Sequence, residues 1–595
     1  MVSRLRRLQV VHPPQAISRP WGNVTSEGYT VSAVVIDRRH YTWHDAVHEV
    51  DGQPGGGLNI AHEAVRRHAR STRRDHVAIR LVRQDRSVRN LTYHELDASA
   101  SKFATVLRRL GIRDGHTVAV LLQRSPELYI AALGTWMRTA MFCPLYAAFG
   151  PEPIRQRMLR GNVNVLVTTQ AMFERKVWHM LSALPSLQYV ILVDAAVHMA
   201  PNVFAMSLLM ADADADYVIP RTDPMLPASL HFTSGTTGMP KGAVHVHRAL
   251  YTHLATARNV LELHDEDVFW CTADPGWVTG TSYGIIAPLI CGITMVVDEA
   301  EFDASRWYGI LEEHRVTVWY TAPTAIRRLM RLHIVPHESY NLEFLRTVHS
   351  VGEPLPADAV EWGVRNLGRP ILDNWWQTET GGIMIANTPS MAIKPGSMGK
   401  PVPGVSAAIA EVTATAVRIL DTPDVKGQLV LKRDLPSLCT TYIQDDERYQ
   451  RMFRGEWYVT GDVARCDSEG YFWYVGRGDD IIKTSGHMVG PFEVERILVE
   501  HRHVAEAAVI GIPDAVVGEM VRAYVVLRQG SIDCDELRQD ILAEARRRLG
   551  AAIAPKEVVV IDSIPKTRSG KIMRRLLKTR ALGLPEGDTS TMERD

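Results

Sequence analysis

Short runs of β-branched and aliphatic residues alternate with amphipathic segments along most of the chain. The runs at 118–122 (VAVLL) and 163–167 (VNVLV) predict buried strands, and residues 96–110 carry apolar side chains at helical spacing. Strands that alternate with helices are typical of a parallel sheet covered by helices. The pattern therefore predicts a domain of the α/β class.

Beyond Asp479 the pattern becomes a compact series of shorter elements. We expect two helices, three strands and the order helix 491–501, strand 505–512, strand 521–527, helix 534–549, strand 557–561. A unit of about a hundred residues is within the usual size of a domain. We therefore expect an extension at 1–40, a large domain at 41–478 and a small α+β domain at 479–595.

Polar stretches indicate loops, and the length of the apolar stretches decides whether a membrane helix is expected. Residues 51–57 (DGQPGGG) and 211–216 (ADADAD) offer no apolar face, so we expect exposed loops there. The longest mainly apolar stretch, 283–297, is shorter than the roughly 20 residues that span a membrane. Pro288 and Gly292 also interrupt it. No transmembrane helix is predicted.

Length, charge and cysteine content indicate the number of domains, the kind of partner and the cellular compartment. A chain of 595 residues is too long for one hydrophobic core. Lysine plus arginine and aspartate plus glutamate number 67 each, so net charge favours neither nucleic acid nor a membrane as partner. The six cysteines lie far apart without CxxC or zinc-type spacing, which indicates a reducing compartment such as the cytoplasm. The first 26 residues carry four arginines and no acid, and either a transit peptide or a solvated extension fits them.

The first segment with clear chemistry is the string TSGTTGMPKG at 233–242, after an expected strand at 228–232. Glycines permit tight curvature, hydroxyls and amides donate to phosphate oxygens, and the lysine adds a positive charge. A Walker A loop is excluded because Lys241 is followed by Gly242 rather than by serine or threonine. We predict a triphosphate-binding loop with the candidate residues Thr233, Ser234, Gly235, Thr236, Thr237, Gly238 and Lys241.

This string resembles the signature loop of the acyl-adenylate-forming superfamily, which includes acyl-CoA synthetases, luciferases and peptide adenylation domains. Segments 351–354 (VGEP), 373–381 (DNWWQTETG) and 458–462 (YVTGD) match further motifs of the superfamily in the expected order. Segments 319–324, 394–400 and 587–592 are similar to prokaryotic acetyl-CoA synthetases. The resemblance implies a large N-terminal domain of stacked α/β sheets with a smaller β subdomain, followed by a mobile C-terminal lid.

The resemblance also implies a nucleotide site. Asp462 would accept hydrogen bonds from the ribose diol, Thr378 would contact the α-phosphate and the acyl oxygen, and Glu379 would bind Mg²⁺. The other implied contacts to ATP or AMP are Gly352, Glu353, Pro354, Asp373, Asn374, Trp375, Trp376, Gln377 and Arg477.

Two segments near the C-terminus match the moving parts of the superfamily. Asp479, within 476–483 (GRGDDIIK), corresponds to the hinge of the lid. Lys571, within 565–575 (PKTRSGKIMRR), corresponds to the catalytic lysine, which stabilises charge as a carboxylate attacks the α-phosphorus. Acetylation would remove that charge, so the resemblance implies a lysine acetyltransferase and deacetylase as partners.

The implied acyl pocket is small. Trp277, Val278, Thr279, Val351 and Trp376 match its lining in acetyl-CoA synthetases, with Trp376 as the floor. An indole at the floor would clash with a chain of more than a few carbons. Acetate is the expected substrate, although one methylene changes discrimination by only roughly 10- to 200-fold, so propionate remains open.

The match departs from the family at one position in the lid. Met488 stands where the family usually has an arginine, so either a nearby cation such as Lys483 substitutes or the thioester step is impaired. Gly486 and Arg546 are the candidate contacts to coenzyme A.

Together these segments predict an acid–thiol ligase that converts acetate, ATP and coenzyme A to acetyl-CoA, AMP and diphosphate. Two alternatives stay open. One is a ligase of the same fold for another short acid, and the other is a nucleotide-binding relative with little turnover.

Overall fold

The computed structural model describes residues 41–233, 240–332, 336–484, 487–514, 517–550, 553–567, 571–586, 589 and 592. The extension expected at 1–40 lies outside these residues. Within them no helix combines the length and the apolar character needed to cross a membrane.

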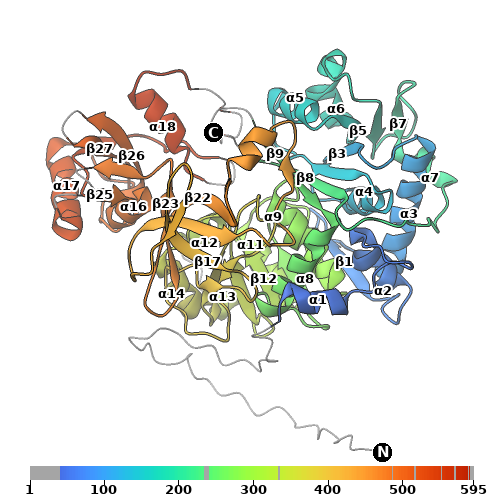
Figure 1. Cartoon of the computed structure of the whole chain (residues 1–595), viewed down its shortest axis with the longest axis horizontal. Helices are drawn as coiled ribbons and strands as arrows, with labels where there is room; N and C mark the ends of the chain where they lie inside the picture. The colour runs from blue at the N-terminus through green and yellow to red at the C-terminus, as the bar shows by residue number, and fades with distance from the viewer. Residues whose placement is uncertain are drawn as a thin grey trace, which may run out of the picture.

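An eight-stranded sheet contains the predicted strands at 118–122 and 163–167, and Figure 1 shows it at the upper right. Its order is β20-β9-β8-β4-β3-β5-β6-β7. The bounds are β3 Thr117–Leu121, β4 Met141–Pro144, β5 Val163–Thr168, β6 Tyr189–Leu192, β7 Val203–Ala205, β8 Pro227–Thr233, β9 Lys241–Val246 and β20 Thr441–Tyr442. Strands β3 to β8 run parallel, and β9 turns back antiparallel to β8.

A nine-stranded sheet lies below it and has the order β16-β15-β14-β13-β12-β10-β11-β1-β2. The bounds are β1 Val77–Val82, β2 Val88–Thr92, β10 Val268–Cys271, β11 Thr294–Asp298, β12 Val318–Thr321, β13 Thr347–Ser350, β14 Ile371–Trp375, β15 Ile385–Ala386 and β16 Lys400–Pro401. The strands from β14 to β1 are parallel. β11, β12, β13 and β14 are buried along their whole length, as expected for a sheet covered on both faces.

Helices between the two sheets join them through one core. Helix α3, Tyr93–Arg109, begins at a capping box formed by Thr92 and Glu95, which fixes its start three residues before the predicted 96–110. Helix α4, Pro126–Met137, packs against α3 so closely that a Cβ at Gly134 would lie 2.8 Å from the Ala100 carbonyl oxygen. Side chains of both sheets join these helices and α8, Leu250–Asn259, in one hydrophobic core.

The other face of the nine-stranded sheet is covered by a separate set of helices. These are α11 Ala304–Glu313, α12 Pro323–Met330 and α14 Ala357–Leu367. They form a second core with side chains of the sheet, including Trp270, Trp319 and Val348. The predicted α/β class with stacked sheets is confirmed.

A smaller β sheet, the β subdomain, is built from strands between residues 407 and 477. Its order is β18-β17-β19-β22-β21, with β23 beside β22. The bounds are β17 Ala407–Val412, β18 Val417–Ile419, β19 Gly427–Lys432, β21 Phe453–Arg454, β22 Trp457–Cys466 and β23 Phe472–Arg477.

The C-terminal elements form a sheet of their own, drawn in orange and red in Figure 1. Its strands are β24 Ile482–Thr484, β25 His487–Val489, β26 Val504–Asp514, β27 Gly518–Leu527 and β28 Glu557–Val560. Alternate residues of β26 face opposite layers. Ala507 and Val509 join the core that includes α16 (Pro491–Val499) and α17 (Asp535–Leu549), whereas Ala508 and Ile510 join α18 (Arg574–Ala581). The predicted elements are confirmed, with ends that differ by at most three residues.

The two loops expected to be exposed are each buried in part. Residues 51–57 are not exposed throughout, because Gln53 is buried and its side chain bonds to the backbone of Pro220 and Thr222 at 2.9 Å each. A glutamine that satisfies its amide on a distant backbone can be buried without an apolar face nearby. In the second loop Ala213 is buried and its three aspartates are exposed.

Candidate active site

A cleft of about 1970 Å³ lies where the nine-stranded sheet meets the β subdomain and the C-terminal sheet. Parallel strands of the large sheet end at this cleft, and the segments that follow them form its wall: 272–279 after β10, 322–324 after β12, 351–354 after β13 and 376–379 after β14. Ligands of open α/β sheets bind in the crevice at the carboxyl ends of the strands. The architecture itself therefore marks this cleft as the candidate site.

Asp462 lies on strand β22 and lines the cleft. Its Oδ2 accepts from Trp375 Nε1 at 3.0 Å and from Gln377 Nε2 at 2.8 Å, and its Oδ1 accepts from Arg477 at 3.1 Å. Burial raises the pKa of Asp462, and the charge of Arg477 opposes this. Three donors on a carboxylate that is 3% exposed fix its position before any ligand arrives.

Glu379 and Lys241 both line the cleft and both contact Tyr442. Tyr442 Oη donates to Glu379 Oε1 at 2.6 Å, and Lys241 Nζ lies 5.7 Å from the centre of the Tyr442 ring. Burial lowers the pKa of Lys241, and the charge of Glu379 opposes this. Lys241 begins β9 directly opposite Thr233 of β8, so the predicted phosphate loop connects two antiparallel strands. Ser234, Gly235, Thr236, Thr237 and Gly238 lie outside the described residues.

The residues expected at the acyl pocket come together. Trp277, Val278, Thr279, Val351 and Trp376 all line the cleft. Trp277 packs against Tyr146 with ring centres 5.4 Å apart. Trp376 is 8% exposed and lies 5.3 Å from Tyr283, ring edge to ring face. Paired tryptophans usually belong to a hydrophobic core. Trp375 and Trp376 belong both to the core and to the wall of the cleft.

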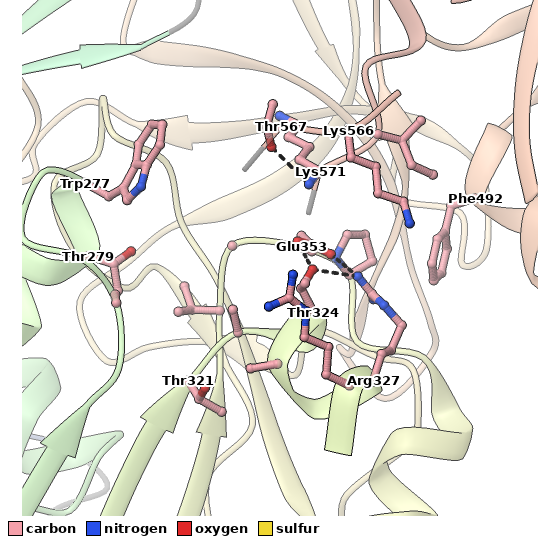
Figure 2. Close-up of a pocket in the computed structure, with 18 of the residues that line it drawn as sticks. Trp277, Thr279, Thr321, Thr324, Arg327, Glu353, Phe492, Lys566, Thr567 and Lys571 are labelled. Atoms are coloured by element: carbon pink, nitrogen blue, oxygen red, sulfur yellow. Dashed lines mark hydrogen bonds and ion pairs between the residues drawn. The ribbon is translucent and has the colours of Figure 1, made fainter. Parts of the chain in front are cut away.

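The segment 351–354 is held in place by helix α12. Glu353 accepts from Thr324 Oγ1 at 2.6 Å and forms an ion pair with Arg327, as Figure 2 shows. Gly352 is exposed to the cleft with φ of +97°, a conformation that favours glycine. Thr324 lay within a segment that matched the family, but nothing in the sequence marked Arg327 as its partner.

Lys571 lies on the opposite wall, contributed by the C-terminal segment. Its backbone N donates to Thr567 Oγ1 at 3.0 Å, and Thr567 N donates to the Lys571 carbonyl at 2.8 Å. Figure 2 shows both residues across the cleft from Glu353 and Thr324. Lys571 and Asp462 line the same cleft, and the positive charge of Lys571 is among the influences that lower the pKa of Asp462.

Ion pairs connect the C-terminal unit to the rest of the chain. Arg331 donates to Glu506 at 3.1 Å, and Glu506 also pairs with Lys566. Lys426, just before β19, lies 2.9 Å from Glu493 of α16. These contacts hold the face that carries Lys571 against the cleft.

The candidate hinge residue and the candidate contacts to coenzyme A differ in their position relative to the cleft. Asp479 is half-exposed, 3.6 Å from Arg477 Nε. Arg546 is exposed on α17 and is not among the described residues that line the cleft. Gly486 lies outside the described residues, and Met488 is the cross-strand neighbour of Lys483 in the hairpin of β24 and β25.

The carboxylates of the cleft decide which metal ion could bind there. Within the described ranges no group of three or more histidine, cysteine, aspartate or glutamate side chains could hold a metal ion. The carboxylate of Glu379 lines the cleft, and such a donor fits Mg²⁺, which is commonly bound by one or two carboxylates together with substrate phosphates and water.

Comparison with known proteins identifies the family of the chain. The family model described as AMP-binding enzyme matches residues 65–442, and the model of the AMP-binding enzyme C-terminal domain matches 493–571. The acetyl-coenzyme A synthetase of Bacillus subtilis is 43% identical, covering 93% of this chain and 96% of that protein. The acetyl-coenzyme A synthetase of Methanothrix thermoacetophila is 37% identical over 90% of this chain and 85% of that protein.

Solved structures share the fold. An acyl-CoA synthetase of Brucella canis superposes with a TM-score of 0.70 at 31% identity, covering 91% of this chain and 97% of that one. An anthranilate CoA ligase in complex with anthranoyl-AMP gives a TM-score of 0.78 at 26% identity, covering 89% and 98%.

Proposed function

The chain belongs to the AMP-binding enzyme family, and from that premise we propose that it is an AMP-forming acetyl-CoA synthetase. It converts acetate, ATP and coenzyme A to acetyl-CoA, AMP and diphosphate through an acetyl-adenylate. One observation carries this conclusion: Trp376, the proposed floor of the acyl pocket, lines the same cleft as Asp462 and Lys571. The two curated acetyl-coenzyme A synthetases named above support it.

In the first half-reaction an acetate oxygen forms a bond to the α-phosphorus of ATP. The bond from that phosphorus to the bridging oxygen breaks, and its electron pair leaves with diphosphate. Asp462 would hold the ribose diol, while Thr378 would orient the α-phosphate and the acyl oxygen. Lys241 and Lys571 would stabilise the negative charge that develops on the transferring groups.

In the second half-reaction the deprotonated sulfur of coenzyme A forms a bond to the acetyl carbonyl carbon. The bond from that carbon to the phosphate oxygen breaks, and AMP leaves with the electron pair. The lid would rotate about Asp479 between the two steps, taking Lys571 out of the cleft. Gly486 and Arg546 are the proposed contacts to coenzyme A, and Lys483 is the cation available beside Met488.

Several finer assignments belong to the same proposal. Mg²⁺ would be held by Glu379 together with substrate phosphates, where it would neutralise phosphate charge. Gly352, Glu353 and Pro354 would lie against the adenine, with Asp373, Asn374, Trp375 and Gln377 beneath the nucleotide and Arg477 beside the ribose. The phosphate contacts Ser234, Gly235, Thr236, Thr237 and Gly238 would complete the site.

We also propose the domain limits, location and partners. The large domain would span 41–478 and the lid 479–595, which the separate core of the C-terminal sheet supports. The six cysteines, which lie far apart in the sequence without CxxC or zinc-type spacing, support a cytoplasmic location. Lys571 is the proposed target of a lysine acetyltransferase and deacetylase, because acetylation would remove its charge.

A substrate panel tests the proposal. ATP is supplied with acetate, propionate or butyrate, with and without coenzyme A, and both diphosphate and acyl-CoA are measured. We expect both products with acetate and little with butyrate. Diphosphate exchange without acyl-CoA would place a defect in the second step at Met488, and no turnover with any acid would refute the proposed function.

A further inference from the structure

A short series of buried polar groups holds the indole at the floor of the acyl pocket. Trp376 Nε1 lies 3.2 Å from Tyr320 Oη, and Tyr320 Oη lies 2.9 Å from Asn374 Oδ1. An indole N–H can only donate, so the phenol oxygen accepts from Trp376 and its single proton goes to Asn374. The direction of both hydrogen bonds is therefore fixed.

The surroundings leave this phenol no alternative partner in water. Tyr320, on β12, is completely buried, and Asn374, on β14, is 3% exposed. Tyr283 presents an edge-to-face contact to both rings, 5.6 Å from Tyr320 and 5.3 Å from Trp376. The indole is thus packed by one aromatic ring and anchored at one polar atom.

The anchor bears directly on which acids fit. A tryptophan side chain can adopt several staggered rotamers, and the hydrogen bond from Trp376 Nε1 to Tyr320 Oη favours the observed one. Leaving that rotamer would strip the buried N–H of its acceptor, which is costly away from water. Exclusion of longer acids then depends on how firmly Trp376 is held as well as on its size.

We propose that Tyr320 is a specificity-determining positioning residue, whose phenol holds Trp376 in the rotamer that closes the pocket against acids longer than acetate. This inference rests on the proposed function. Tyr320 acts through Trp376, and its hydroxyl group rather than its ring carries the effect.

The test replaces the hydroxyl alone. In the Tyr320→Phe variant the ratio of kcat/KM for acetate to kcat/KM for butyrate should fall by about fivefold or more, the factor set by one neutral hydrogen bond. A merely structural role would lower kcat/KM for both acids equally. The matched control is Tyr308→Phe, because Tyr308 is a buried tyrosine of α11 whose hydroxyl has no hydrogen-bond partner in the described part of the chain.

A double-mutant cycle separates action through the indole from direct contact with substrate. In a Trp376→Gly background, Tyr320→Phe should cause no further change in the acetate-to-butyrate ratio. An unchanged ratio in the single variant, or an equal change in the Trp376→Gly background, would overturn the inference. If the Tyr320→Phe variant does not fold, Tyr320 is replaced by 4-fluorophenylalanine, which keeps the volume of the phenol. The acetate-to-butyrate ratio is then compared in the same way. Absence of acetate activation in the unaltered enzyme would instead refute the proposed function.

Discussion

The ion pair between Lys426 and Glu493 gives a direct test of the lid assignment. Lys426 belongs to the β subdomain and Glu493 to α16 of the C-terminal unit, and neither residue lines the cleft. Lys426→Gln should therefore leave substrate contacts intact. It should weaken only the arrangement in which Lys571 faces the nucleotide, and so slow the adenylation step.

The exposure of the pair sets the size of the effect. The two side chains are 33% and 38% exposed, so solvent screens the attraction and a value of about 0.2–1 kcal/mol is expected. That range changes the equilibrium between the two lid positions by at most about fivefold. Because other contacts such as Arg331 with Glu506 remain, we expect loss of rate rather than loss of activity.

The assay is acetate-dependent exchange of labelled diphosphate into ATP without coenzyme A, at low salt. The exchange rate of Lys426→Gln should fall by up to about fivefold, and high salt should narrow its difference from the unaltered enzyme because mobile ions screen the pair. Lys426→Glu combined with Glu493→Lys should restore the rate. The control is Arg538→Gln, which breaks an exposed ion pair with Asp533 inside the C-terminal unit. Equal exchange rates in Lys426→Gln and the control, at low salt, would refute the reasoning.

Three further outcomes are expected. Lys571→Ala should slow diphosphate exchange by about a hundredfold or more while sparing formation of acetyl-CoA from supplied acetyl-adenylate, and equal loss in both assays would contradict its assignment to the first step. Trp376→Gly should raise kcat/KM for butyrate relative to acetate at a cost of about 3–5 kcal/mol in the free energy of unfolding, and an unchanged preference would remove the indole from the pocket floor. Burial lowers the pKa of His68, His247 and His349 to about 3 and that of His253 to about 4. Because the unfolded chain then binds more protons below its ordinary histidine pKa of about 6.5, the free energy of unfolding in urea should decrease as the pH falls from 6.5 towards 4; a constant value between pH 6.5 and 5 would show that these rings are not neutral in the fold.

Local patterns predicted the elements well because burial and capping act over short distances in the chain. The strand at 163–167 and the helix at 96–110 were recognisable since their apolar periodicity matches the faces they bury. Gln53 was missed because its burial depends on backbone groups of residues 220 and 222, more than 160 positions away. No local pattern carries that information.

The candidate site was likewise predicted only in part from the sequence. The motifs predicted which side chains meet at the cleft, including Asp462 and Trp376. They did not predict what holds those side chains, such as Tyr442 on Glu379 or Arg327 on Glu353, since these partners lie between 26 and 63 positions away and belong to no motif. Supporting residues need only the right position in space, so many sequences can supply them.

The residues that would surround the acid and the charge that would activate it come from parts of the chain with separate cores. Trp376 and Val351 follow strands of the nine-stranded sheet, whereas Lys571 belongs to the C-terminal unit with its own core. Substitutions that reshape the pocket therefore need not disturb the lysine. Substitutions at a few positions of the cleft wall could therefore give activity towards new acids while Lys571 keeps its position. The same separation is open to protein engineering.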